Sequence, residues 1–360
     1  MKPLRLGIIG CGNMSDSHGK SYAELEGEIV VTATCDIVLE RAQVMADAVG
    51  ATLAVSDYRD LVNEVDAVLI VLPHDLHHEA GKYFLEAGKH VLMEKPLCNT
   101  EEECIDLIHT AERMNKVLMT AYPIRFIPLV SKLKEVLDSR AYGDVFQISI
   151  WTEQYTYYEQ GHWASQAKRL GGGQFFSHGC HYVDLLLWFL GKPAKGIHFG
   201  TNYGTPWMEK EGTSNAIIEF ESGALGYHFG TWGARGTRLG YSIHAHCTEG
   251  MLEFNLAEGK LYVHRNLVAH KSLGDEGEKE AQEKEVLMEM KEVGKLTHYE
   301  LKHFAHCIRT GSKPLTDAPG SLQGLRVIWR MYEAERQGGI ADLRGLGLED
   351  NWNEIRDCII

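Results

Sequence analysis

The stretch Glu94-Lys95-Pro96 presents a carboxylate and an ammonium directly after an apolar segment, residues 90–93. Such a change from apolar to charged residues is typical of the carboxyl end of a parallel strand, where open α/β sheets bind their ligands. The proline pushes Lys95 away from helical geometry, and a Lys–Pro bond can also be cis. We expect the ammonium of Lys95 to face a ligand; the alternative is a surface ion pair with Glu94.

A second motif, GGGQFFSHGCHYVDLLLWFLG at 171–191, carries side chains that could act with this lysine. We expect a helix over 177–190, on which Ser177, His181 and Asp184 lie at i, i+4 and i+7 on one face. The pKa of an imidazole lies near neutrality, so His181 can accept a hydroxyl proton while hydride leaves the carbon. Ser177 or Asp184 could orient the ring; the alternative is that His181 is a structural histidine.

The glycines near the N-terminus form a dinucleotide-binding pattern. An apolar strand at 4–9 leads into Gly10-Cys11-Gly12-Asn13-Met14-Ser15, which has the spacing G-x-G-x-x-S and precedes a helical segment. Gly10 permits the tight turn, and Gly12 lets the backbone approach a pyrophosphate. The next strand ends at Asp36, which can bind the ribose 2′-hydroxyl of NAD and would repel the phosphate of NADP. The residues expected to contact NAD are Gly10, Gly12, Asn13, Met14, Asp36, Pro73, His74, His77, Glu94 and Lys95.

A parallel sheet would bring these residues to one edge. Residues 66–73 form a nearly all-apolar run, as expected for a strand with helices over both faces. Thr100 is a plausible N-cap of the helix that follows the lysine motif, with Glu103 at the capping-box position. Because Lys95 and Tyr122 both follow apolar strands, they should reach the same edge of the sheet as the glycine loop.

The alternation of apolar strands and helices ends near residue 128, and a helix is expected at about 128–139. Several later segments alternate apolar and polar residues, as an antiparallel sheet with one exposed face would. These segments are 144–155, 213–222, 224–233, 241–250 and 251–256. The expected fold is α/β, with an N-terminal Rossmann domain in 1–124. Residues 125–360 should form an α+β domain with a large, mainly antiparallel open sheet. The charged segment 274–285 should be a solvated loop or the flank of a hairpin.

Together these motifs resemble the Gfo/Idh/MocA oxidoreductases, the family of glucose–fructose oxidoreductase and inositol dehydrogenase. The resemblance rests on GIIGCGNMS, the Cys-Asp pair at 35–36, P-H-x-x-H at 73–77, AGKHVLMEKPL, RFIP at 125–128, the 171–191 motif and YELKHFAHCIRTGSKPLT. It implies a tightly held nicotinamide cofactor and hydride transfer at a secondary alcohol, commonly of a sugar or cyclitol. By position, Lys95 would contact both the reacting hydroxyl and the nicotinamide region, and His181 would be the active-site histidine.

The chain departs from the family pattern at two positions. Ser177 stands where many members have Asp, which puts an Asp–His proton relay in doubt. His74 stands where many have Asn, which puts in doubt how the nicotinamide ribose is held.

The segment 151–163 is rich in Trp and Tyr, whose faces suit the C–H faces of sugar rings or aromatic aglycones; core or subunit-interface positions are the alternative. The chain shows no dense phosphate-binding cluster beyond the glycine loop, which favours a neutral polyol, sugar or glycoside. The residues expected to bind substrate are Lys95, Tyr122, Arg125, Trp163, Ser177, His178, His181 and Asp184. For Arg125, surface or interdomain pairing is an equal alternative, as is a structural role for His178.

The reaction we expect is NAD-dependent oxidation of a secondary ring hydroxyl to a ketone. The resemblance points to C3 of a glucosyl unit, because oxidation there recurs among relatives. Two alternatives stay open: an inositol or cyclitol dehydrogenase, and a non-catalytic NAD(H)-binding homologue.

The length and composition of the chain limit the classes of molecule that it could bind. The 360 residues suffice for two domains, and the formal net charge of −14 argues against nucleic acid or an anionic membrane. No apolar run reaches the roughly 18 residues of a membrane span. The eight cysteines form no CxxC pair, which favours reduced thiols in the cytoplasm. Histidines gather at 74–78, 178–181 and 244–246, but no cluster supplies a full zinc set, so we predict no metal. A homo-oligomer built through the second sheet is a further implication of the resemblance.

Overall fold

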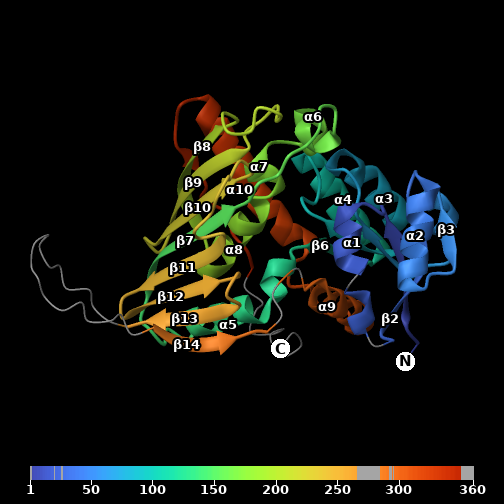
Figure 1. Ribbon diagram of the computed structural model, residues 1–360, viewed down its shortest axis with the longest axis horizontal. Helices are drawn as coiled ribbons and strands as arrows, with labels where there is room; N and C mark the ends of the chain where they lie inside the picture. The colour runs from blue at the N-terminus through green and yellow to red at the C-terminus, as the bar shows by residue number, and fades with distance from the viewer. Residues whose placement is uncertain are drawn as a thin grey trace, which may run out of the picture.

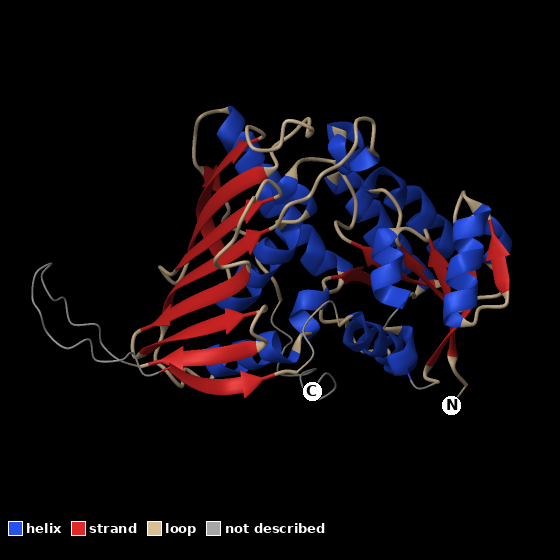
Figure 2. Cartoon of the chain, in the orientation of Figure 1, coloured by secondary structure: helices blue, strands red, loops and turns tan. Residues whose placement is uncertain are grey.

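The computed structural model describes residues 2–19, 21–25, 27–265, 284–291, 294 and 296–349. Two sheets lie side by side, a smaller one among helices and a larger one with one open face (Figures 1 and 2). The fold class expected from the sequence is therefore confirmed. Of the charged segment 274–285, all but the last two residues lie outside the described part, and those two belong to strand β14.

The first sheet is parallel, with six strands in the order β3-β2-β1-β4-β5-β6. Its strands are short and mostly apolar because helices cover both faces; all four residues of β4 are fully buried. The strand order reverses between β1 and β4, and ligands of open α/β sheets bind at such a point. The strands are β1 (Leu4–Ile9), β2 (Ile29–Cys35), β3 (Leu53–Val55), β4 (Ala67–Ile70), β5 (His90–Glu94) and β6 (Leu118–Ala121). The helices are α1 (Asn13–Gly19), α2 (Leu39–Val49), α3 (His77–Glu86) and α4 (Glu101–Met114).

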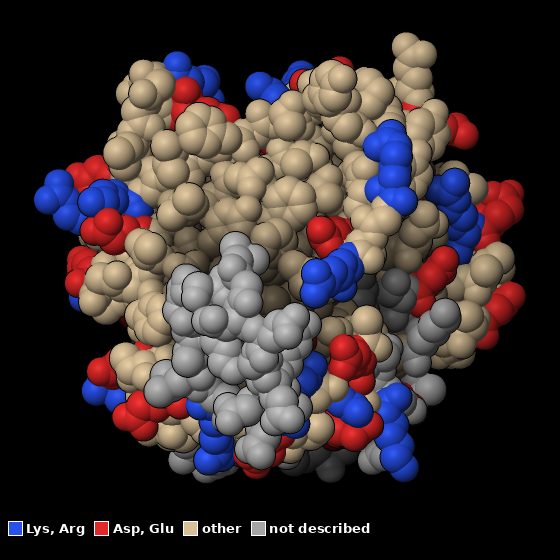
Figure 3. Space-filling model, turned by 60° about the vertical axis from the view of Figure 1, so that its left-hand side comes forward, with Lys and Arg blue, Asp and Glu red and all other residues tan. Residues whose placement is uncertain are grey.

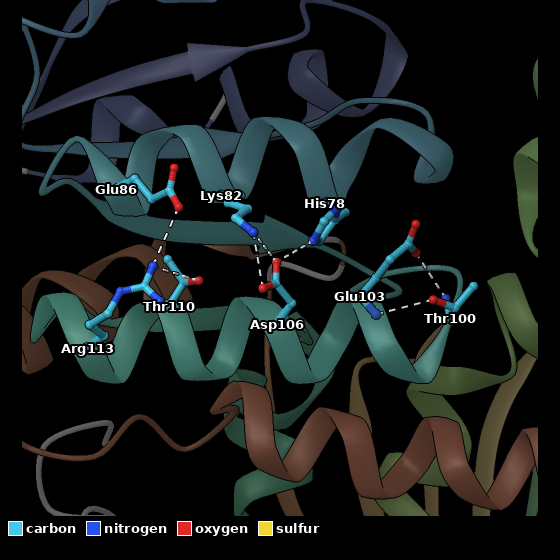
Figure 4. Close-up of polar contacts among 8 residues, drawn as sticks. All are labelled: His78, Lys82, Glu86, Thr100, Glu103, Asp106, Thr110 and Arg113. Carbon is cyan, nitrogen blue, oxygen red and sulfur yellow. Dashed lines mark hydrogen bonds and ion pairs between the residues drawn. The ribbon is translucent and has the colours of Figure 1, made fainter.

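Polar contacts join helices α3 and α4, which lie side by side (Figure 4). Asp106 accepts hydrogen bonds from Lys82 Nζ at 2.9 Å and from His78 Nε2 at 2.7 Å. The bond from Lys82 is the main cause that lowers the pKa of Asp106. Each partly exposed pair contributes only about 0–1 kcal/mol. The helices begin soon after the turns that carry His74 and Lys95, so their pairing helps to fix the spacing of those turns.

The second sheet has nine strands in the order β14-β13-β12-β11-β7-β10-β9-β8-β15, antiparallel except for the parallel pair β7–β10. Helices α7, α8 and α10 lie between it and the first sheet (Figure 1), and every residue of α8 is buried. The strands are β7 (Val145–Glu153), β8 (Pro193–Thr201), β9 (Thr213–Phe220), β10 (Leu225–Thr231), β11 (Tyr241–Cys247), β12 (Gly250–Asn255), β13 (Lys260–His264), β14 (Lys284–Glu289) and β15 (Ala341–Asp342). The helices are α5 (Pro128–Asp138), α6 (Ala167–Leu170), α7 (Gln174–Ser177), α8 (Cys180–Leu190), α9 (Thr297–Thr310) and α10 (Ala318–Arg336).

Where Figure 3 shows the outer face of the large sheet clear of grey atoms, its centre is largely uncharged, with acidic and basic residues around it. Phe146, Phe199, Ile217 and Leu225 project from its strands with 39–64% of their surface exposed. Exposed apolar side chains gathered on one face are a common feature of subunit interfaces.

The C-terminal helices return to the first domain. The Thr120 N–H donates to the Thr316 carbonyl at 2.9 Å, and Thr316 Oγ1 donates back to the Thr120 carbonyl at 2.8 Å. Arg326 of α10 pairs with Glu101 of α4 at 2.7 Å. The predicted boundary at 124/125 falls inside a short 3₁₀ turn, Pro123–Phe126, and residues on both sides of it belong to one continuous hydrophobic core.

Candidate active site

The glycine loop lies at the carboxyl end of β1. Gly10 has φ +93°, and a Cβ there would lie 2.2 Å from the carbonyl oxygen of Val71, so only glycine fits. A Cβ on Gly12 would meet no protein atom within 4 Å. Packing therefore does not require glycine at position 12, and the space beside it suits a ligand that approaches the backbone. Asn13 is exposed and Met14 half-buried in the first turn of α1.

Asp36 follows the last residue of β2 and is half-buried. Its Oδ2 accepts a hydrogen bond from the Cys11 N–H at 2.9 Å, so the carboxylate helps to hold the glycine loop. The next side chain, Ile37, is 91% exposed and uncharged. These residues fit a dinucleotide whose ribose hydroxyls donate to a carboxylate.

Lys95 stands directly after β5, and its bond to Pro96 is cis. Its ammonium donates to the main-chain carbonyl oxygen of Ser177 at 3.1 Å, which joins the two domains. The carboxylate of Glu94 is 6% exposed; its Oε1 lies 2.9 Å from His18 Nε2. Glu94 Oε2 accepts the Lys95 backbone N–H at 3.1 Å. The two side chains are thus not a surface ion pair, and a buried His18–Glu94 contact supports the lysine turn.

The helix expected over 177–190 is wrong in one respect, because the chain breaks at His178-Gly179 between α7 and α8. A Cβ on Gly179 would lie 2.4 Å from the carbonyl oxygen of Phe175, so this point is tightly packed. In a continuous helix, the Ser177 carbonyl would accept the His181 N–H. Here the His181 N–H bonds to the His178 carbonyl, and the carbonyl of Ser177 accepts from Lys95.

His181 is 8% exposed, and its ring packs edge-to-face on Tyr122 at a centroid distance of 5.4 Å. Tyr122 is held by a hydrogen bond between its hydroxyl and Ser321 Oγ at 3.2 Å. Burial raises the pKa of Tyr122 well above its usual value, so the phenol keeps its proton. The structure thus brings Lys95, His181 and Tyr122 around the Ser177 break.

The helical spacing suggested that Asp184 could orient the ring of His181, but Asp184 binds another residue. Its two oxygens accept bonds of 2.6 Å from Arg125, and neither residue is more than 4% exposed. Arg125 also donates to the Leu315 carbonyl at 3.1 Å. The pairing of Arg125 is thus buried and lies within the second domain, so it is neither a surface nor an interdomain pair. Arg125 and Asp184 line a cavity of about 160 Å³ with Lys313 and Asp317.

His74 and Trp163 meet across the domains. The His74 Nδ1–H donates to the Leu170 carbonyl at 2.9 Å, and its ring lies edge-to-face on Trp163 at 5.0 Å. Burial, then the neighbouring His77 and Lys95, lower the pKa of His74 well below its usual value, so the ring is neutral. Pro73 precedes it as the N-cap of the short turn 74–76.

His77 is fully buried between the carbonyl oxygens of Leu72 and Pro96, 2.9 Å from each. Two carbonyl acceptors would favour a doubly protonated ring, but burial outweighs them and lowers the pKa of His77. His77 therefore links the turns that follow β4 and β5.

The three glycines at 171–173 serve close packing. Gly171 has φ +82°, and a Cβ on it would lie 2.3 Å from Asn99 Oδ1; one on Gly173 would lie 2.3 Å from the Glu211 carboxylate. Glu211 in turn accepts from the Tyr332 hydroxyl. The sequence patterns did not identify His18, Glu211 and Tyr332 as supports of the site; the position of His18 on the helix after the glycine loop was the available signal.

Within the described residues, no three His, Cys, Asp or Glu side chains are grouped so that they could hold a metal ion. The seven cysteines of that part are buried. None of the helices there is both long and apolar enough to cross a membrane.

The chain has a Rossmann domain with a glycine loop, followed by a domain with an open sheet. A lysine and a histidine lie where the two domains meet. These features define a two-domain protein of the dinucleotide-binding class. A family model described as "Oxidoreductase family, NAD-binding Rossmann fold" matches residues 4–122, and the "GFO/IDH/MocA C-terminal domain" matches residues 130–253. The chain belongs to the Gfo/Idh/MocA family of oxidoreductases, and NAD is its cofactor.

Similar proteins act on sugars according to their names. D-glucoside 3-dehydrogenase of Escherichia coli (strain K12) is 29% identical over 194 residues, which are 53% of this chain and 55% of that protein, so the match spans about half of either. Levoglucosan dehydrogenase of Pseudarthrobacter phenanthrenivorans is 24% identical over 295 residues, 71% of this chain and 74% of that protein. A structure of levoglucosan dehydrogenase with NADH and levoglucosan superposes with a TM-score of 0.84 at 21% identity, covering 95% of this chain and all of that one, and so shows the same fold.

Proposed function

We propose that this protein oxidises a secondary ring hydroxyl of a sugar or glycoside to a ketone, with NAD as the hydride acceptor, and that its preferred position is C3 of a glucosyl unit. The observation that carries the proposal is the contact of Lys95 with the Ser177 carbonyl at 3.1 Å. This contact places an ammonium from the cofactor domain against the break that precedes His181. The names of similar proteins, which include a glucoside 3-dehydrogenase, support the choice of a sugar and of C3.

In this mechanism, the substrate carbinol loses a hydride and a proton. NAD supplies the hydride acceptor when it is bound between the glycine loop and Asp36. His181, neutral, takes the hydroxyl proton as the C–O bond becomes a carbonyl. The Lys95 ammonium donates a hydrogen bond to the same oxygen and stabilises its developing negative charge. The Ser177 carbonyl keeps the ammonium in place, and Tyr122 keeps the imidazole plane fixed.

The experiment is to record reduced-nicotinamide absorbance while the protein and NAD meet glucose, inositols and O- and C-linked aryl glucosides. A rise with glucosides and a 3-keto product by NMR would support the proposal. A rise with inositols alone would favour a cyclitol dehydrogenase, an alternative supported by 30% identity over 143 residues to a protein named inositol 2-dehydrogenase/D-chiro-inositol 3-dehydrogenase. If no substrate changes the absorbance, the protein is extracted for bound nucleotide. Bound NAD(H) would indicate a redox cycle on a tightly held cofactor or the wrong panel of substrates, whereas no nucleotide and no binding of added NAD would favour a non-catalytic homologue.

We also propose that the outer face of the large sheet forms a subunit interface between copies of the chain. Its exposed Phe146, Phe199, Ile217 and Leu225 support this. Light scattering would test it, and a monomer at micromolar concentration would contradict it.

A further inference from the structure

A chain of three polar side chains leads from the large sheet to the edge of the site. Ser214 Oγ on β9 donates to Gln174 Oε1 at 2.6 Å, and Gln174 Nε2 lies 3.3 Å from His178 Nδ1. Ser214 and Gln174 are fully buried. His178 is half-buried, whereas every other residue from 172 to 190 is buried, and its ring centroid lies 6.0 Å from that of His181. The buried polar chain therefore leads to a partly exposed imidazole beside the proposed base.

The direction of these bonds defines the tautomer of His178. Because the hydroxyl of Ser214 donates to the amide oxygen of Gln174, the amide NH₂ faces the imidazole, and Nδ1 is the acceptor. A neutral imidazole carries one N–H, which is then on Nε2.

Packing keeps this amide from turning or moving away. Gly230 on β10 lies directly opposite Ser214 in the sheet, and a Cβ on it would lie 2.2 Å from Gln174 Nε2 and 2.6 Å from Oε1. The amide thus rests on bare backbone. The rings of Tyr182 and Tyr241 stand edge-on to His178 at 5.3 and 5.9 Å and hold its plane.

We propose that Ser214 and Gln174 are positioning residues that hold His178 as an Nε2–H donor, and that this donor binds an oxygen acceptor of the substrate next to the carbon being oxidised. The proposal rests on the proposed function. An N–H donor selects hydroxyl, ring or glycosidic oxygens and disfavours an ammonium at that position. It therefore gives the site a preference for neutral, hydroxylated sugars over amino sugars.

The test is Gln174→Glu, which keeps the shape of the side chain but offers His178 only an acceptor. We expect KM for the sugar to rise by about tenfold or more, as for a buried polar group left unpaired, with a much smaller change in kcat. Gly230→Ala should act in the same direction, since its methyl group occupies the space of the Gln174 amide. The matched control is Asn215→Asp, also an amide-to-acid change. Asn215 is the next residue on β9, its Oδ1 accepts from the Tyr227 hydroxyl, and it lies outside the chain of bonds to His178.

Nitrogen-15 NMR of histidine-labelled protein gives an independent readout, with the His178 signals assigned by their loss in His178→Gln. The expected result is a neutral His178 protonated on Nε2 in the wild type and, at a pH where the ring is neutral, a His178 protonated on Nδ1 alone in Gln174→Glu. A doubly protonated ring in the variant would keep the Nε2–H donor, and the inference then predicts no rise of KM. Protonation on Nδ1 in the wild type would overturn the inference, as would a rise of KM no larger than in Asn215→Asp. If no sugar or polyol is oxidised at all, the proposed function fails, while the NMR measurement still decides the tautomer.

Discussion

The ammonium of Lys95 lies 3.1 Å from the main-chain carbonyl oxygen of Ser177, so a backbone group of the second domain holds the candidate catalytic cation of the first. The carbonyl can do so because the chain breaks between α7 and α8, where the Cβ space of Gly179 is taken by Phe175. The partner of the lysine is therefore a main-chain group, which does not depend on the side chain at position 177. This also means that the site does not depend on a carboxylate at 177 to orient Lys95.

Replacement of Lys95 by alanine should lower kcat by at least about 10²-fold, as is typical for a positioned acid–base group, and leave NAD binding intact. Turnover by reduced-nicotinamide absorbance and NAD binding by calorimetry measure the two effects. Lys168→Ala, at an exposed position on α6, is the control and should have little effect. Equal turnover of the two variants would remove Lys95 from the chemistry.

Replacement of His181 by glutamine should lower kcat by a factor similar to that for Lys95→Ala, and it should change the pH profile of kcat/KM. In the wild type, kcat/KM should rise with pH as the imidazole loses its proton, because only the neutral ring accepts the hydroxyl proton. The variant should lack this rise. A profile that keeps the same rise in His181→Gln would assign the base to another group, with Lys95 as the first candidate.

Much of the first domain could be predicted from the sequence, because its signals are local. The strand at Ala67–Ile70 is apolar throughout, and the T-E-E-E run gives the capping box of Thr100 and Glu103 that the structure contains. The break at His178-Gly179 was not predicted, because the apolar run and the spacing of Ser177, His181 and Asp184 both fit one continuous helix. Helical spacing suggested that Asp184 would serve His181, but an arginine from another element, Arg125, binds it instead.

The second sheet was predicted only where alternation is regular. Strands β7, β9, β10, β11 and β12 follow the expected segments. The sequence patterns did not predict β8, β13, β14 or β15. Strands β14 and β15 lie at the edges of the sheet, where a strand has one neighbour and its alternation of apolar and polar residues is less constrained. Strand β8 contains Pro193 and Gly196, which are unfavourable in strands.

Replacement of Asp36 by alanine should weaken the binding of NAD by about tenfold or more, as for loss of hydrogen bonds to a charged group. It should also reduce the preference of the protein for NAD over NADP. Because Asp36 also accepts the Cys11 N–H, part of this loss reflects the glycine loop. Asp36→Asn separates the effects, since it keeps an acceptor but removes the charge that repels a 2′-phosphate. An unchanged NAD/NADP ratio in both variants would contradict the ribose role.

Replacement of Asp184 by asparagine should affect stability more than chemistry. It leaves the guanidinium of Arg125 buried without its countercharge, and breaking such a pair typically costs about 3–5 kcal/mol of the free energy of unfolding. Asp342→Asn, in an exposed pair with Arg344, is the control and should change the free energy of unfolding far less, because solvent screens that pair. Urea unfolding gives these values. A large fall of kcat in folded Asp184→Asn, with little loss of stability, would show that Asp184 takes part in the reaction.

Acidification should destabilise the fold from the pH at which unfolded histidines begin to protonate. Burial lowers the pKa of His90 to about 4, and its Nδ1 accepts the Val117 N–H at 3.0 Å, so the native ring is neutral. The unfolded ring titrates near about 6.5. Between these values the unfolded state binds the extra proton, so the contribution of His90 is complete above about 6.5 and is lost as pH falls toward 4. His90→Asn keeps an acceptor but cannot titrate, and urea midpoints from pH 7.5 to 4.5 should fall less steeply for this variant. Parallel curves for wild type and variant would show that His90 is not among the groups responsible.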